Sequence, residues 1–234
     1  PGRLLDHVRR ASIDCTNIRH LVLDEADRML DMGFREDLEA IVDALPADRH
    51  SHLVSATFSP QVRRLADKVQ QDAVHLQGTE LGAANDDIEH AASLVERGDT
   101  YAAIVNALLL AQGEKVLVFV ERRADTTELT DKLTGDGFAV QALSGELSQS
   151  QRNRALEAFK SGVADVLVST DVAARGLDVP DISLVIQVDL PKEADDYTHR
   201  SGRTGRAGKK GTSVVVSIPA ELGLVNRVLR RAGI

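Results

Sequence analysis

Three carboxylates come in quick succession where a short apolar run ends, in the stretch His20-Leu21-Val22-Leu23-Asp24-Glu25-Ala26-Asp27. A continuous apolar run is typical of a buried parallel strand, and open α/β sheets bind their ligands at the carboxyl ends of such strands. Two adjacent acids at that point can divide the work of metal-assisted hydrolysis, because one can hold a hydrated Mg²⁺ while the other orients or deprotonates water. The alternative is a solvated turn whose acids cap the next helix.

Two further apolar runs also end in polar residues, and a basic segment follows them near the end of the chain. The three segments are Ser55-Ala56-Thr57, Thr170-Asp171-Val172-Ala173-Ala174-Arg175-Gly176-Leu177-Asp178 and His199-Arg200-Ser201-Gly202-Arg203-Thr204-Gly205-Arg206-Ala207-Gly208. Together with the acidic stretch, this ordered set resembles the motifs of the DEAD-box family of ATP-dependent RNA helicases: Asp-Glu-Ala-Asp, Ser-Ala-Thr, Ala-Arg-Gly-x-Asp and His-Arg-x-Gly-Arg-x-Gly-Arg. The resemblance covers nearly the whole chain, and a coincidence of four motifs in order is negligible.

The resemblance implies an enzyme that hydrolyses ATP with Mg²⁺ and separates short RNA duplexes locally. In the acidic motif it implies that Asp24 holds Mg²⁺ through water and that Glu25 is the general base for the attacking water. It implies that Asp27, Ser55, Thr57 and His199 couple hydrolysis to closure of two domains around the nucleotide.

The remaining roles concern phosphate groups. The resemblance places Arg175, Gly176 and Asp178 in the nucleotide site between the domains, and Arg203 and Arg206 as arginine fingers for the γ-phosphate. The run 197–212 has five basic residues and no acid, and its Arg-x-x-Arg spacing puts two planar guanidinium groups on one side of a turn, although a solvated basic loop is the alternative. The residues that resemble the family's contacts to the RNA backbone are Pro1, Gly2, Arg3, Gln149, Arg152 and Thr170.

Composition limits how RNA could be bound. A net charge of −8 and a pI near 5.4 argue against a protein held to nucleic acid by a broad basic surface, because affinity of that kind grows with the number of phosphates neutralised. With no Trp, two Tyr and five Phe, there are few rings on which bases could stack. We therefore expect local contacts to the RNA backbone that are independent of its sequence. The single Cys15 excludes an internal disulfide and a cysteine-based zinc site.

Strand and helix patterns alternate along the chain, which indicates parallel sheets flanked by helices. We therefore predict the α/β class. The resemblance implies RecA-like sheets: the rear part of a first domain at 1–76, a linker at 77–88 and a complete second domain at 89–234. The expected strands are 18–24, 52–55, 73–76, 90–95, 115–120, 138–142, 164–168, 182–188 and 212–217. The expected helices are 31–44, 60–70, 100–111, 124–134, 149–160, 193–201 and 219–231.

The printed residues contain no G-x-x-x-x-G-K-[ST] phosphate loop, so we expect a piece of a longer enzyme that does not hydrolyse ATP alone. The alternative is a non-catalytic module that binds RNA or a protein. A DNA-directed relative is disfavoured by the Asp-Glu-Ala-Asp tetrad and by the last motif's ending in Gly-Arg-Ala-Gly. No run approaches a membrane span and no leader is visible, so we expect a cytoplasmic location without a membrane partner.

Overall fold

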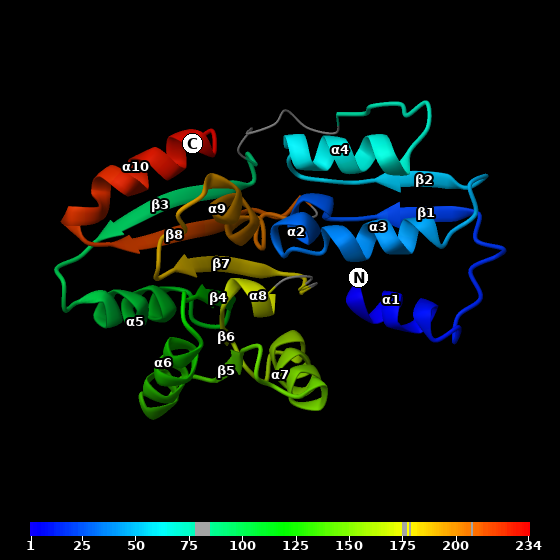
Figure 1. Cartoon of the computed structure of the whole chain (residues 1–234). Helices are drawn as coiled ribbons and strands as arrows, with labels where there is room; N and C mark the ends of the chain where they lie inside the picture. Colours follow the sequence, from blue (N-terminus) through cyan, green and yellow to red (C-terminus); the bar gives the residue numbers. More distant parts are fainter. Residues whose placement is uncertain (78–84, 175–176, 178, 207) are drawn as a thin grey trace. The chain divides into compact units, whose positions relative to one another are not determined.

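The computed structural model describes residues 1–77, 85–174, 177, 179–206 and 208–234, which form two compact units, Pro1–Leu81 and Gly82–Ile234 (Figure 1). In this described part of the chain, none of the helices has the length and apolar character needed to cross a membrane.

The described residues of the first unit form two parallel strands and four helices. In chain order these are α1 (Gly2–Arg9), β1 (His20–Leu23), α2 (Ala26–Asp31), α3 (Arg35–Asp43), β2 (His50–Leu53) and α4 (Pro60–Val69). Pro60 suits the first position of a helix because its missing N–H would be unpaired there, and the Ser59 side chain caps α4 by accepting from the Val62 N–H.

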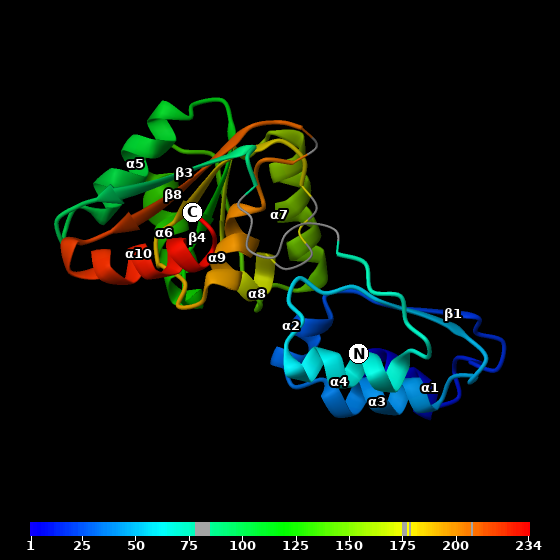
Figure 2. The same ribbon diagram turned by 90° about the horizontal axis from the view of Figure 1, so that it is seen from above.

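The small sheet of the first unit is packed on one face. Leu21, Leu23 and Leu53 contact apolar residues of α2, α3 and α4, and the helices lie on one side of the strands (Figure 2). The opposite face carries exposed Val22 and the rings of His20 and His50, whose centroids lie 5.3 Å apart. Side chains alternate between the faces of a strand, so one apolar set faces the helices and the other set does not.

The second unit is a six-stranded parallel sheet with the strand order β3-β8-β7-β4-β6-β5. The strands are β3 (Ile88–Leu94), β4 (Lys115–Phe119), β5 (Val140–Leu143), β6 (Val166–Ser169), β7 (Ile182–Gln187) and β8 (Gly211–Ser217). The helices are α5 (Thr100–Leu110), α6 (Arg123–Gly135), α7 (Gln149–Ser161), α8 (Asp171–Ala174), α9 (Ala194–Ser201) and α10 (Leu222–Arg231), the last preceded by the short helix η1 (Pro219–Glu221).

Helices cover both faces of this sheet. Val116 and Val118 of β4 pack against α5 and α6, whereas Leu117 and Phe119 of the same strand pack against α7 and α8. The helices α9 and α10 pack on Val215 of β8, and Figure 2 shows them across the sheet from α5. Strands buried on both faces read as continuous apolar runs, as the central strands here do.

The predicted α/β class is confirmed, but one strand prediction is wrong. Residues 73–76 form no strand, and Val74 and Leu76 are 82% and 89% exposed, because an apolar run becomes a strand only beside a pairing partner. The strand expected at 52–55 is β2, which ends at Leu53. The helices α1, α2 and α8 were not expected, and Gly2 and Arg3 lie in the first turn of α1.

The predicted linker, 77–88, falls mostly outside the described residues. Its last part is described: the Asn85 side chain donates to the Gly205 carbonyl at 2.9 Å, and Ile88 begins β3. The division into the proposed domains stays a prediction.

Candidate functional site

Asp24 and Glu25 lie at the carboxyl end of β1, and both side chains are exposed. Glu25 adopts the left-handed conformation, with φ of 51°, and its N–H donates to Asp24 Oδ1 at 2.9 Å. The next residue, Ala26, is fully buried, and its N–H donates to the Val54 carbonyl at 3.1 Å. This tight turn holds the backbone against β2 while both carboxylates face outwards, where a ligand could reach them.

Asp27, Ser55 and Thr57 form one hydrogen-bonded group. The buried Asp27 carboxylate accepts from the Thr57 N–H at 2.8 Å and from the Thr57 hydroxyl at 3.0 Å. The Ser55 hydroxyl accepts from the Asp27 N–H at 3.2 Å and donates to the Thr57 carbonyl at 2.7 Å. The structure thus brings together three of the four residues expected to couple hydrolysis to closure, and it ties the turn after β1 to the loop after β2. The fourth, His199, lies half-buried on α9 in the second unit.

Arg203 and Arg206 lie on the loop that follows α9. Arg203 Nη1 donates to the Leu177 carbonyl at 3.1 Å, whereas Arg206 is exposed and its Nε donates to the Gly202 carbonyl at 2.7 Å. Between them, the buried Thr204 hydroxyl donates to the Ile182 carbonyl, at the start of β7. The loop is therefore anchored to the sheet at its centre, and the two predicted arginines lie on either side of the anchor.

The buried Arg200, in the same segment, makes an ion pair with Asp171 that the sequence motifs do not predict. It is 4% exposed, and its Nε and Nη2 each donate to an Asp171 carboxylate oxygen at 2.6 Å. Its Nη1 donates to the Asp189 carbonyl at 2.5 Å, and the guanidinium lies 5.2 Å from the Phe119 ring centroid. This two-pronged ion pair fixes α8 to α9. Both residues stand inside the quoted motifs, but only the folded sheet brings them together.

The residues expected to contact RNA lie in both units. Thr170 and Arg152 meet at α8: the Thr170 carbonyl accepts from the Ala174 N–H at 3.0 Å, and Arg152 Nη2 donates to the Ala173 carbonyl at 2.7 Å. The Thr170 side chain is buried. Gln149 is exposed at the start of α7, and Pro1, Gly2 and Arg3 lie at the start of α1 in the first unit. Arg175, Gly176 and Asp178, expected in the nucleotide site, are outside the described residues.

The donor set at β1 suits a hydrated magnesium ion. Magnesium prefers hard oxygen ligands and commonly keeps several of its waters, so one or two carboxylates are enough to hold it. The described residues contain no group of three or more His, Cys, Asp and Glu side chains able to hold a metal ion. One Asp24 oxygen accepts from the Glu25 N–H, and its other oxygen makes no hydrogen bond to a described residue. The fit is therefore to an ion held through water, not to one enclosed by protein ligands.

Comparisons with known proteins agree with this geometry. A model described as "DEAD/DEAH box helicase" matches residues 1–65, and a model described as "Helicase conserved C-terminal domain" matches residues 99–208. The chain is 38% identical over 214 residues to the ATP-dependent RNA helicase DbpA of Bacillus subtilis, covering 92% of this chain and 45% of DbpA. The chain thus spans less than half the length of that relative.

Two solved structures extend the comparison. Dbp5 of S. cerevisiae bound to RNA and ADP BeF3 matches all of this chain, covering 62% of that chain, with a TM-score of 0.88 and 31% identity. The E. coli DEAD-box protein SrmB, bound to the regulator of ribonuclease activity A, matches 60% of this chain and 81% of that chain, with a TM-score of 0.53 and 38% identity.

The parallel α/β units, the acidic turn after β1 and the arginine-rich loop after α9 define a protein of the helicase class. Within that class, the chain belongs to the DEAD-box family.

Proposed function

We propose that the full-length protein is an ATP-dependent RNA helicase that hydrolyses ATP and separates short RNA duplexes. The observation that carries this proposal is the acidic turn: exposed Asp24 and Glu25 stand beside the hydrogen-bonded group of buried Asp27 with half-buried Ser55 and Thr57. Membership of the DEAD-box family supports it, and DbpA is named as an ATP-dependent RNA helicase.

Asp24 and Glu25 take different tasks in this proposal. Asp24 holds Mg²⁺ through water, and the ion, when bound, neutralises charge on the phosphate oxygens. Glu25 accepts the proton of the attacking water, because its carboxylate is exposed and joined to no other described residue. The left-handed turn at Glu25 keeps the two carboxylates on neighbouring residues while the backbone continues into α2.

Asp27, Ser55 and Thr57 take no part in the chemical step; they transmit movement between two loops. Their hydrogen bonds join the backbone that follows β1 to the backbone that follows β2. A shift of one loop is thereby imposed on the other. His199 is the corresponding residue of the second unit in this proposal.

Arg203 and Arg206 stabilise charge that grows on the γ-phosphoryl group, with Arg175, Gly176 and Asp178 in the same nucleotide site. A planar guanidinium spreads over two phosphate oxygens at once, which an ammonium cannot do. RNA is held by its backbone through Pro1, Gly2, Arg3, Gln149, Arg152 and Thr170. For Arg152 and Thr170, support comes from the hydrogen bonds that join both residues to the backbone of α8.

The general base is tested by Glu25→Gln in the full-length protein. We expect ATP hydrolysis to fall by about 100-fold or more, while ATP-dependent RNA binding persists, because the substitution removes the base but leaves Asp24. Glu36→Gln, an exposed residue of α3, is the matched control and should hydrolyse ATP at the wild-type rate. Unchanged hydrolysis in Glu25→Gln would show that Glu25 is not the general base. Absence of hydrolysis in the wild type, with RNA binding intact, would support a binding module instead of an enzyme.

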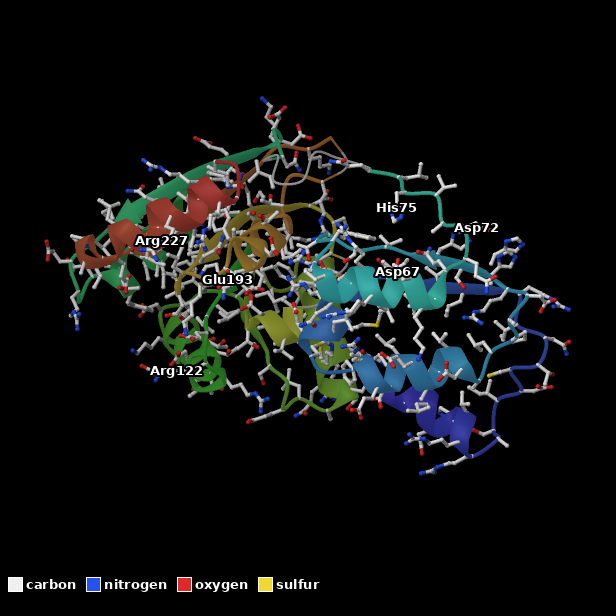
Figure 3. All side chains as sticks on the ribbon, turned by 45° about the horizontal axis from the view of Figure 1, so that its top comes forward. Asp67, Asp72, His75, Arg122, Glu193 and Arg227 are labelled. Carbon is white, nitrogen blue, oxygen red and sulfur yellow. The ribbon has the colours of Figure 1, made fainter. Side chains whose placement is uncertain are left out.

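The arginine fingers are tested separately, by single-turnover hydrolysis with saturating RNA. We expect Arg203→Ala and Arg206→Ala each to lower kcat by about 10³-fold with a smaller change in KM, because the lost contact is strongest in the transition state. Arg227→Ala on α10 is the control, since Arg227 is exposed and has no assigned role (Figure 3). If the whole defect disappears when RNA is raised, these arginines contact RNA and not the γ-phosphate.

A further inference from the structure

Helix α5 of the second unit has no charged side chain, although much of it faces solvent. Its sequence is Thr-Tyr-Ala-Ala-Ile-Val-Asn-Ala-Leu-Leu-Leu, and only Ile104 and Leu108 are buried. Leu109 and Leu110 are 56% and 91% exposed. A surface helix normally turns charged and polar residues outwards, so this exposed apolar face is unusual for a helix without a partner.

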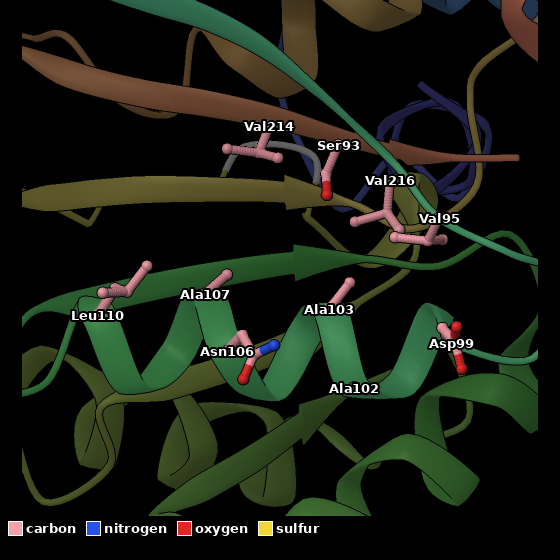
Figure 4. A pocket seen from close by; sticks show the side chains of 10 residues that line it. All are labelled: Ser93, Val95, Asp99, Ala102, Ala103, Asn106, Ala107, Leu110, Val214 and Val216. Carbon is pink, nitrogen blue, oxygen red and sulfur yellow. The ribbon is translucent and has the colours of Figure 1, made fainter. Parts of the chain in front are cut away.

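A groove of about 440 Å³ runs between α5 and the strands β3 and β8 (Figure 4). The pairs Ala91–Val214 and Ser93–Val216 are in register, so their side chains share the face of the sheet that α5 covers. Small residues at Ala103 and Ala107 fill little of the space between the helix and this face. The result is a mostly apolar groove whose lining includes Ser93, Val95, Ala103, Ala107, Leu110 and Val214.

The groove lies along an unpaired sheet edge. Among the described strands, β3 pairs only with β8. The Val95 N–H donates to the Ser217 carbonyl, and the Asp87 carbonyl accepts from the Gly211 N–H, both at 2.9 Å. Alternate residues of a strand direct their backbone groups to opposite sides, so His90, Ala92 and Leu94 present N–H and C=O groups to the free edge. Such an edge can accept an added strand.

Acidic side chains flank this edge at both ends. Asp86 and Glu89 are exposed at the start of β3, and Glu96 and Asp99 are exposed beyond its end, with Arg97 as the one cation among them. A second copy pairing antiparallel about Ala92 would bring the acidic start of one β3 beside the acidic segment that follows the other β3, and the repulsion disfavours that dimer. An RNA strand would meet the same negative charge. A segment with cationic ends is favoured instead, because its charges would be attracted to the acidic residues that repel a second copy and RNA.

We propose that β3 and the groove beside α5 form a docking site for an extended segment of another protein, apolar at alternate positions and basic at its ends. The segment adds a strand to the edge at His90, Ala92 and Leu94 and places aliphatic side chains in the groove. None of the groove residues belongs to the nucleotide or RNA site proposed above, so docking leaves hydrolysis free to proceed.

The test is fluorescence anisotropy of the full-length protein with a synthetic peptide of alternating valine and threonine between pairs of lysines. A peptide with glutamates in place of the lysines is the charge control. We expect the lysine-flanked peptide to bind at least about tenfold more tightly than the glutamate-flanked one, with the difference shrinking in high salt. No binding of the lysine-flanked peptide, or equal binding of both peptides, overturns the proposal.

Matched variants locate the site. Leu110→Lys, which places a cation in the groove, should weaken binding about tenfold, whereas Leu109→Lys on the adjacent position outside the groove should not. Glu96→Lys should weaken binding, whereas Glu157→Lys on α7 should not, although both change the net charge equally. Equal effects of Leu109→Lys and Leu110→Lys, or of the two glutamate changes, overturn the location.

A proline substitution tests whether the peptide pairs with the backbone of β3. Ala92→Pro removes an outward N–H from an edge position where proline is tolerated, and it should abolish binding while the thermal unfolding temperature changes little. Undiminished binding in a folded Ala92→Pro protein overturns strand addition. If this variant does not fold, the pair Leu109→Lys and Leu110→Lys decides the proposal alone. A concentration-dependent dimer that Leu110→Lys dissociates would identify a second copy as the occupant and overturn it.

Discussion

The Arg200 guanidinium is buried in the second unit, and all three of its nitrogens have partners. A buried charge is tolerated only while its counter-charge is present. If one partner of the ion pair is removed, the other stays buried, where neither water nor another ion compensates its charge. The pair is therefore a sensitive point for the stability of the second unit, independently of any role in catalysis.

We expect Asp171→Ala to lower the free energy of unfolding by about 3 kcal/mol, because Arg200 would remain buried without a counter-charge. Urea unfolding followed by circular dichroism measures the change. The exposed pair Arg122–Asp125, with its Nη2–Oδ1 distance of 2.8 Å, is the control, since Arg122→Ala should cost less than about 1 kcal/mol (Figure 3). Equal losses in the two variants would show that burial does not make the difference.

His90 makes the stability of the second unit depend on pH. Burial lowers the pKa of its imidazole, whose Nδ1 lies 2.7 Å from the Tyr197 hydroxyl, and no described group bonds its buried Nε2. The folded pKa lies below the unfolded value of about 6.5, so the unfolded chain takes up the proton more readily. The contribution of His90 to stability is therefore complete above that pH and is lost as the pH falls through the folded pKa.

We expect the unfolding temperature of wild type to fall on acidification more steeply than that of His90→Phe. His75→Gln is the control, because His75 is exposed and should leave the pH dependence of wild type intact (Figure 3). Calorimetry across about pH 5 to 7.5 gives the slopes. Parallel slopes in wild type and His90→Phe would exclude His90 as the source.

At the scale of the elements, the start of β8 requires glycine. A Cβ on Gly211 would collide with the side chain of Thr204, the residue that anchors the arginine-bearing loop to Ile182. The strand and the loop can approach this closely only because Gly211 has no side chain.

We expect Gly211→Ala to destabilise the protein by about 1–3 kcal/mol, because the collision displaces either the strand or the loop. Gly223→Ala in α10 is the matched control. No atom lies within 4 Å of its added Cβ, and alanine favours a helix over glycine by up to about 1 kcal/mol. Thermal unfolding should therefore move in opposite directions in the two variants, and a shift of the same sign in both would contradict the collision.

The sequence predicts the elements best where a strand is buried on both faces. The expected strand 115–120 and the observed β4 differ by one residue, since its apolar run is short and rich in valine and phenylalanine, which favours a strand over a helix. Residues 73–76, a shorter run interrupted by His75, form no strand, because their sequence does not show whether another strand lies beside them. The short helices α2 and α8 contain too few residues for a periodic pattern.

The same limit applies to the candidate site. The resemblance assigns Asp27, Ser55 and Thr57 to one group, and the structure joins them by hydrogen bonds because each follows a strand end; their coupling role stays a prediction. The resemblance did not show that Arg200 pairs with Asp171, since that contact depends on how α8 and α9 pack on the folded sheet. Contacts between segments that are far apart in the sequence depend on the order of the strands and the packing of the helices. Short motifs do not contain that information.

At the scale of the whole molecule, the two units have unequal cores. The first has two paired strands with one face open, where Val22 and Val54 are exposed, and the second has six strands covered on both faces. Local opening is easiest where few apolar contacts must be broken.

In amide hydrogen exchange of the 234-residue chain, we expect β1 and β2 to exchange much faster than β4, β6 and β7. Exchange measured peptide by peptide with mass spectrometry separates the two units. Uniform protection along the chain would show that the open face of the first sheet does not weaken it.

The pairing of β3 with β8 has a consequence for synthesis on the ribosome. The first described strand of the second unit to emerge is Ile88–Leu94, and its only neighbour among the described strands, Gly211–Ser217, is the last described strand of that unit to be translated. At cellular elongation rates, the nascent β3 waits on the order of ten seconds for that neighbour. During this interval both of its edges are open, and the acidic residues at its ends are then its protection against pairing with the same strand of another nascent chain.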